Sequence, residues 1–291
     1  MDLSNPLNVW WLVMVILNAM SVITYAVLCV MSIKRDKLEP ENRRYKTIMR
    51  CAGAIFVFVS MYRSIFVSSY PNRLTWFDSM LNSPLIIRFL ATFAELSFAV
   101  LVMVPILHIN KENPLKCEFA KSGFGSFLIY KLPYAAFICL FTAQFCAYGG
   151  LFTQHLTLFA IEETLWALGF FSVLPAAIAQ GRDIFKNHKG EREYRLVKAA
   201  LFVLCLYTVG YLIYQFGFSL PFTYYSQIPS DLLKNHLTIA EGARLALYKF
   251  SACRDFDTWG GIGFFIWHSG YFSLCTWMNI LFASAPRKLK R

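Results

Sequence analysis

Charged residues are scarce in this chain. Asp, Glu, Lys and Arg make up only 15% of its 291 residues, whereas soluble domains carry about 25%. Apolar runs recur from end to end, and ~20 consecutive apolar residues are enough to cross a bilayer as a helix. The composition therefore argues against a large soluble domain and indicates a multi-pass integral membrane protein.

Several motifs are also missing. The eight cysteines are scattered without a Cys-x-x-Cys pair, which argues against a zinc ribbon or an iron–sulfur cluster. No basic stretch precedes the first apolar run, so we expect that run to be a retained span and not a signal peptide. The runs do not alternate as barrel strands do. No internal repeat is evident, which weakens the inverted-repeat plan of many secondary transporters.

We predict an all-α bundle of seven transmembrane helices, forming a single domain over residues 1–291. Helices satisfy their own backbone hydrogen bonds, as hydrocarbon requires. The predicted spans cover about residues 9–33, 51–69, 84–108, 122–148, 153–181, 197–218 and 258–285. The one long connection contains an apolar repeat at helical spacing. We expect an amphipathic segment at about 229–250 on the outer surface, either covering the bundle or acting as a lid.

The basic residues indicate the topology. The net charge is +11, and most Lys and Arg lie in four segments that share one side of the membrane if seven helices alternate. The positive-inside rule places that side in the cytoplasm. We therefore expect an extracytoplasmic N-terminus and a cytoplasmic C-terminus, in the plasma or inner membrane or in an endomembrane. The excess charge fits attraction to anionic membrane lipids, with no nucleic-acid partner.

Ionisable residues lie deep within the predicted spans. Counted from the nearest span end at 1.5 Å per residue, they lie roughly 13–18 Å deep, near the midplane of a ~30 Å hydrocarbon core. These residues are Arg63, Glu95, Lys131, Glu162, Glu163 and His268. Each charge at this depth costs about 2.5–3.5 kcal/mol even on the mild insertion scale. We therefore expect them to face inward, pair with one another and form a polar site that opens toward the extracytoplasmic side.

The residue types suggest roles in that site. Two buried carboxylates in different environments can divide acid and base roles, and His can transfer protons near neutral pH. The candidate catalytic residues are Glu95, Glu162, Glu163 and His268, and the candidate substrate-binding residues are Arg63, Arg88, Trp166, Tyr211 and Asp255. Of the adjacent Glu162 and Glu163, we expect one to face the cavity and the other to contact a flanking helix, because neighbouring positions point ~100° apart.

The function that these residues favour is a membrane-embedded enzyme acting on a lipid-like or amphiphilic substrate. An ion or proton channel or a transporter that uses the same charge layer is the alternative, and a seven-helix receptor ranks below both. No metal is expected. The alternative metal site would combine His155, Glu162 and His268, but the sequence has no HxxxH or HExxH pair to support it.

Overall fold

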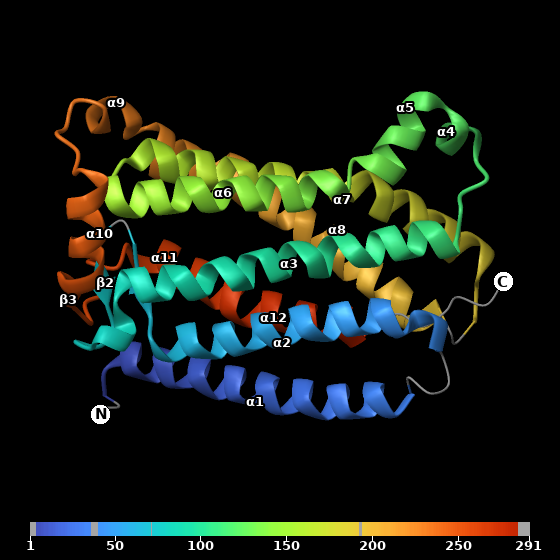
Figure 1. The fold of residues 1–291 in the computed structure, drawn as a ribbon, viewed down its shortest axis with the longest axis horizontal. Coiled ribbons are helices and arrows are strands. Elements are labelled where there is room, and N and C mark those ends of the chain that lie inside the picture. Colours follow the sequence, from blue (N-terminus) through green and yellow to red (C-terminus); the bar gives the residue numbers. More distant parts are fainter. Residues whose placement is uncertain (1–3, 36–39, 71, 192–193, 285–291) are drawn as a thin grey trace.

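The computed structural model describes residues 4–35, 40–70, 72–191 and 194–284, and it shows an all-α bundle (Figure 1). Within these residues, six helices are long and apolar enough to cross a membrane. They are α1 (Pro6–Arg35), α2 (Arg43–Ile65), α3 (Pro84–Glu112), α6 (Tyr134–Thr153), α7 (Leu156–Asn187) and the run that starts with α8 (Arg195–Tyr214) and continues through the π-helix η6 (Gln215–Tyr225) to α9 (Ile228–Asp231).

A further helical run occupies the last predicted span. It consists of α11 (Gly261–Ser269), the π-helix η7 (Gly270–Cys275) and α12 (Thr276–Ser284). Its α12 packs against α1, α2, α3 and α8, so it belongs to the bundle. It is not among the six helices that qualify by length and composition, and polar residues such as His268 and Asn279 interrupt its apolar sequence.

Several boundaries differ from the predicted ones. The α2 helix begins at Arg43, well before residue 51, because its polar first turns are helical but outside the apolar run. The amphipathic segment expected at about 229–250 is not one helix. It divides into α9, which ends at Asp231, and α10 (Ile239–Tyr248). The Thr238 side chain begins α10 by accepting a hydrogen bond from the Glu241 backbone N–H, as an N-cap residue does.

The most extensive contact between two helices of the described residues is in the α6–α7 hairpin. Gln154 ends α6 in the left-handed conformation, with φ of 61°, and reverses the chain so that His155 can begin α7. Gly169 allows the two helices to approach closely, since a Cβ there would overlap the Leu140 side chain. Small residues at such contacts are typical of helix pairs in membranes.

Short strands and helices lie beyond the ends of the long helices. At one end, β1 (Ser68–Ser69), β2 (Leu74–Thr75) and β3 (Ser251–Ala252) form a sheet in the order β1-β2-β3, antiparallel then parallel. The 3-10 helix η3 (Met80–Asn82) precedes α3, and α10 packs on α6 and α3 at this same end. The other end carries η2 (Pro40–Asn42), α4 (Glu118–Lys121), α5 (Gly123–Ser126) and the π-helix η4 (Phe127–Lys131). Figure 1 shows these two groups at opposite ends of the bundle.

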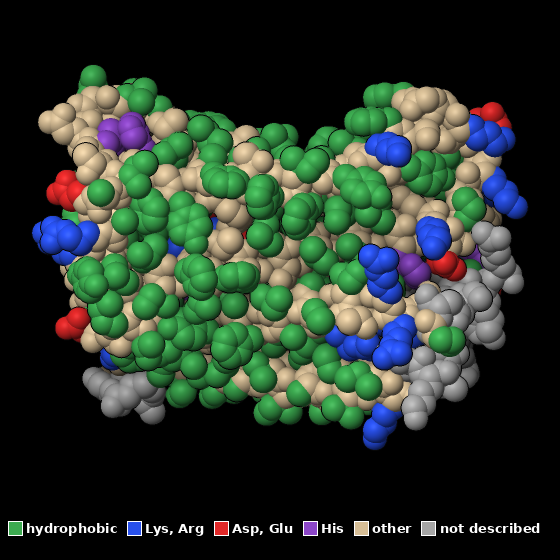
Figure 2. All heavy atoms as spheres, in the orientation of Figure 1, with side chains coloured by type: hydrophobic (Ala, Val, Ile, Leu, Met, Phe, Trp, Pro, Cys, Tyr) green, Lys and Arg blue, Asp and Glu red, His purple; other side chains and the backbone are tan. Residues whose placement is uncertain are grey.

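The surface between these ends is apolar. Figure 2 shows hydrophobic side chains over the middle of the visible face, whereas most of its Lys and Arg side chains gather at the end that carries α4 and α5. Large apolar side chains such as Ile23, Phe58 and Phe145 are more than half exposed. This pattern fits a bundle with lipid around its middle. Residues 36–39, 192–193 and 285–291, which belong to the predicted basic segments, lie outside the described residues.

A buried apolar cluster fills the bundle toward the basic end. It includes Phe98, Leu101, Ile106, Phe170 and Val173. At that end a polar contact joins α3 to α7. Gln180 donates to Asn110 Oδ1 at 2.9 Å, and Asn113 donates to the Gln180 and Asp183 side chains at 3.0 and 2.9 Å.

Candidate functional site

A cavity of about 480 Å³ lies in the opposite half of the bundle, where the strands and α10 are. Its wall combines charged residues of α2, α3 and α7, aromatic residues of α7, α8, η6 and the 261–284 run, and residues of the loops around β1 and before α11. The charged and polar members are Arg63, Arg88, Glu95, Glu162, Glu163, Ser68, Ser69, Asn72, Ser219, Thr223 and Gln227. The cavity thus extends from the interior of the bundle to this end of the protein.

Arg88 is the centre of a buried ion-pair network. Its guanidinium donates to Glu95 Oε2 at 2.6 Å and to Glu162 Oε1 at 3.2 Å, and it also donates to Gln144 Oε1. Gln144 donates in turn to Glu95 Oε2 at 2.9 Å. The Arg88 side chain is only 1% exposed. Arg88 therefore connects the three helices α3, α6 and α7, and it forms ion pairs with both Glu95 and Glu162.

Arg63 is the second cation of the wall, and it is held more loosely. Its Nη1 atom lies 4.0 Å from Glu95 Oε1, and its Cζ atom lies 4.7 Å from the centre of the Phe272 ring and 5.5 Å from that of Tyr70. Tyr70 comes from the loop between α2 and α3. Its burial raises the pKa of the Tyr70 phenol, and the positive charge of Arg63 opposes that shift.

Glu163 has a different environment from the other two glutamates. Gln215 and Tyr211 donate to its Oε2 atom, the latter at 3.5 Å, and Gln215 also donates to the Tyr211 hydroxyl at 2.7 Å. Among the described residues, Glu163 forms no ion pair with Lys or Arg. Its partners are neutral, so its negative charge is balanced by no basic side chain in contact with it.

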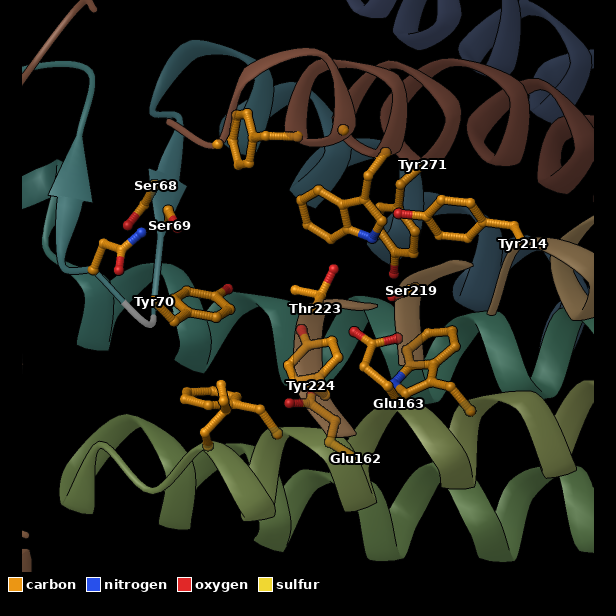
Figure 3. Close-up of a pocket in the computed structure, with 18 of the residues that line it drawn as sticks. Ser68, Ser69, Tyr70, Glu162, Glu163, Tyr214, Ser219, Thr223, Tyr224 and Tyr271 are labelled. Atoms are coloured by element: carbon orange, nitrogen blue, oxygen red, sulfur yellow. The ribbon is translucent and has the colours of Figure 1, made fainter. Parts of the chain in front are cut away.

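Aromatic side chains form most of the remaining wall. Trp166, Tyr207, Tyr211, Tyr214, Tyr224, Trp267 and Tyr271 all line the cavity. Figure 3 shows the Tyr70 ring, the Thr223 hydroxyl and the Glu163 carboxylate pointing toward the same central space. The faces of aromatic rings attract cations within about 6 Å. Together with Glu163, this wall offers a cationic group both ring faces and a carboxylate.

The structure places most of the candidate site residues on this wall. Arg63, Arg88, Glu95, Glu162, Glu163, Trp166 and Tyr211 line the cavity. Glu162 and Glu163 both line it, where the helical phase indicated only one. Lys131, expected in the same layer, lies at the end of η4 and is exposed.

His268 and Asp255 lie off the wall. His268 is 2% exposed and packs against the rings of Trp10 and Phe272, with centroids 5.2 and 4.4 Å away. Asp255 is exposed and accepts hydrogen bonds from Thr258 N and Oγ1 at 2.9 and 2.6 Å. The Thr258 hydroxyl lowers the pKa of Asp255. This contact begins the turn before α11, so it shapes the loop and does not reach the cavity.

Among the residues that the sequence analysis did not identify, Gln144, Gln215 and Tyr70 contact the charged residues of the site. Gln144 carries a usable signal, because it is a polar residue in the middle of an apolar run, FTAQFCAYGG. Gln215 lies near the predicted end of its span at residue 218, where a polar residue is unremarkable. Tyr70 lies in a loop, and only the folded chain shows that this loop turns inward over Arg63 and Arg88.

His155, one of the three residues of the alternative metal site, has different neighbours from those expected. It lies at the N-terminus of α7 and contacts Asp231 and His236. Glu162 is bound to Arg88, and His268 packs among aromatic rings. The one group of His, Cys, Asp and Glu side chains close enough to share an ion, within the described residues, is His155, Asp231 and His236.

Comparisons with known proteins assign no family to this chain. No family model matches it, and neither the curated proteins nor the solved structures give a match.

Proposed function

We propose that this protein is a membrane-embedded enzyme that acts on a lipid-like or amphiphilic substrate, with Glu163 as its acid–base residue. The observation that carries the proposal is the environment of Glu163. It is a carboxylate on the cavity wall that is held by the neutral donors Gln215 and Tyr211 and is free of any Lys or Arg ion pair among the described residues. A carboxylate in that position can accept or donate a proton without breaking an ion pair.

Access for an amphiphile is supported by the exposure of the wall. Thr223 of η6, Gln227 directly before α9 and Gly263 of α11 line the cavity and are themselves exposed, so the cavity opens between the η6–α9 segment and α11. Apolar side chains flank the opening: Phe218, Phe222, Ile262 and Ile266 are 60, 70, 66 and 59% exposed. In a membrane these side chains would contact acyl chains. A headgroup then enters the polar cavity while its tail stays in the bilayer.

The two arginines have separate tasks in this proposal. Arg88 is already committed to Glu95, Glu162 and Gln144, so it fixes the geometry of α3, α6 and α7. Within the described part of the chain, the one carboxylate within 4.0 Å of Arg63 is that of Glu95, at 4.0 Å, so Arg63 can bind an anionic group of the substrate such as a phosphate or carboxylate. The headgroup would thus place an anionic group at Arg63 and its reacting or cationic group at Glu163.

The orientation in the membrane forms part of the proposal. The run 261–284 would be the seventh crossing, because α1 begins at the end that carries β2 and α10, and α12 runs toward the opposite end (Figure 1). The basic end would lie in the cytoplasm by the positive-inside rule. The cavity would then open toward the extracytoplasmic leaflet.

Conduction of ions or protons is the competing function. It requires a polar path from one side of the membrane to the other. In the described residues, the cavity is followed toward the basic end by the buried apolar cluster of Phe98, Leu101, Ile106, Phe170 and Val173. This cluster favours a closed reaction chamber over a through path.

The test is native mass spectrometry of the gently extracted protein, followed by an assay for turnover of whatever amphiphile it retains. Glu163→Gln preserves the size of the side chain and removes the charge. Since a charge-assisted hydrogen bond contributes about 1.5–3 kcal/mol, we expect retention to fall about tenfold or more and turnover to be lost. Glu118→Gln is the matched control, because the Glu118 side chain is 90% exposed at the other end.

Two results would contradict the proposal. One is equal turnover by the wild-type protein and the Glu163→Gln variant. The other is an empty wild-type protein that conducts protons or ions in liposomes, with conduction abolished in Glu163→Gln, which would establish the competing function.

A further inference from the structure

A second group of polar side chains lies beside the cavity, outside its wall. The turn between α6 and α7 contributes His155, the end of α9 contributes Asp231, and the segment before α10 contributes His236. One nitrogen or oxygen atom from each of the three side chains lies within 4.8 Å of the others. Figure 2 shows histidine side chains at the surface near α9. Three segments far apart in the sequence therefore converge through the residue types that bind transition metals.

The distances within this group match those between ligands of a single ion. His155 Nδ1 lies 3.5 Å from Asp231 Oδ2, and His236 Nε2 lies 3.9 Å from the same oxygen. Ligands bound to Zn²⁺ at 2.0–2.1 Å in tetrahedral geometry lie about 3.3 Å apart. The His155 and His236 rings are stacked with 21° between their planes, so they must tilt apart for both nitrogen lone pairs to reach one ion.

The hydrogen bonding of the group leaves a place for an ion. The His155 Nδ1 atom is buried and makes no hydrogen bond with the described residues. The His155 and His236 rings stack with centroids 3.3 Å apart, and a nitrogen of each ring lies within 4 Å of the same Asp231 oxygen. The Asp231 side chain is 6% exposed, and among the described residues it forms no ion pair with Lys or Arg. A buried carboxylate between two imidazoles is stabilised by a cation.

We propose that His155, Asp231 and His236 bind one divalent transition-metal ion, Zn²⁺ in the first instance. Two imidazoles and one carboxylate suit Zn²⁺ better than Ca²⁺ or Mg²⁺, which prefer oxygen ligands. The His155 side chain is 31% exposed, so a water molecule can complete the fourth position. His236 Nε2 lies 2.9 Å from the Asp231 backbone oxygen, which can only accept, so Nε2 carries the ring proton in this arrangement. To bind the ion through Nε2, His236 would give up this hydrogen bond and take the tautomer with its proton on Nδ1.

The site would fasten the segment 226–238 over the cavity. Asp231 Oδ2 accepts from Leu156 N at 2.8 Å, and Asp231 N donates to the Gln227 backbone oxygen at 3.0 Å. Leu156 and Gln227 both line the cavity. An ion held by His155, Asp231 and His236 therefore fixes two wall residues relative to each other. The role is structural and does not depend on the reaction proposed for the cavity.

The full-length protein is treated with a chelator and then titrated with ZnCl₂. Isothermal calorimetry measures the affinity, elemental analysis gives the number of Zn²⁺ ions per chain, and thermal unfolding gives the Tm with and without Zn²⁺. We expect one Zn²⁺ per chain and a higher Tm with Zn²⁺. Because even loss of an outer contact weakens metal binding 10–100-fold, we expect His236→Gln to weaken it by more than about 100-fold and to abolish the rise in Tm. His188→Gln is the matched control, since His188 pairs with Glu191 at the basic end.

A second variant tests whether the loss in His236→Gln arises from misfolding and not from loss of a metal ligand. His155→Gln alters a partly exposed side chain and should give the same loss. Co²⁺ added to the wild-type protein should give the visible absorption of a tetrahedral site, and neither His-to-Gln variant should show it. Failure of the wild-type protein to bind Zn²⁺, or an equal loss in His188→Gln, would overturn the proposal.

Discussion

At the scale of single residues, the three buried glutamates are not equivalent. Glu95 and Glu162 both contact the Arg88 guanidinium, whereas Glu163 is held by an amide and a phenol. Removing one partner from a buried ion pair leaves an uncompensated charge. A substitution at Arg88 should therefore mainly affect folding, and a substitution at Glu163 should mainly affect activity.

Arg88→Met should destabilise the protein more than Arg63→Met. The first substitution leaves Glu95 and Glu162 buried without their cation, a loss of roughly 3–5 kcal/mol. The second removes a guanidinium whose nearest carboxylate oxygen is 4.0 Å away. Thermal unfolding in one detergent measures both. Adding Glu95→Gln to Arg88→Met should recover part of the stability, and equal losses for the two single variants would contradict the network described for Arg88.

At the scale of helices, two π-helical segments contribute to the cavity wall. The η6 segment supplies Ser219, Thr223 and Tyr224, and η7 supplies Tyr271. A π-helix widens the turn and is frequent at functional sites. The apolar pattern of the sequence gives no sign of these segments, because their composition resembles that of the flanking α-helices.

The contact between α10 and α6 depends on Gly242. A Cβ at this position would overlap the backbone carbonyl of Phe152, and a backbone atom cannot move aside as a side chain can. Gly242→Ala should therefore displace α10 and lower stability by about 1–3 kcal/mol. Gly210→Ala is the control, since a Cβ there meets no atom within 4 Å and Ala favours helix by up to ~1 kcal/mol. An unchanged Tm for Gly242→Ala would contradict this contact.

At the scale of the whole molecule, charge and apolar surface divide the bundle into three zones. Exposed apolar side chains cover the middle, a basic zone lies at the end with α4 and α5, and the loops with the strands and α10 lie at the other end (Figures 1 and 2). The cavity lies at the end with the strands and α10. Membrane orientation therefore decides to which compartment the cavity opens.

The proposed topology can be measured by labelling cysteines introduced at the two ends. Glu118→Cys marks the basic end, and Leu233→Cys marks the other, where Leu233 is 88% exposed. The eight native cysteines are first replaced by serine, because exposed ones such as Cys117 would also react. In sealed vesicles of known orientation, a membrane-impermeant maleimide should then reach only the Leu233→Cys site from the extracytoplasmic side and the Glu118→Cys site after permeabilisation. Labelling of both sites from one side would contradict opposite locations, and the reverse pattern would invert the orientation.

The sequence by itself determined that the chain is a helical membrane bundle, because long apolar runs have few other stable structures. It also singled out Glu95, Glu162 and Glu163 through the cost of burying their charges in hydrocarbon. These properties depend on local composition and helical period, which a single sequence displays directly.

Only the tertiary structure decided how these residues are divided among partners. In the folded chain, Arg88 forms ion pairs with both Glu95 and Glu162, whereas Glu163 accepts hydrogen bonds from Gln215 and Tyr211. His268 lies off the cavity wall and packs against Trp10. His155 lies close to Asp231 and His236. The physical reason is that contacts between helices depend on their relative rotation and depth, and on loops such as 226–238. Those quantities are set by packing of the whole bundle and leave no periodic signal in any one segment.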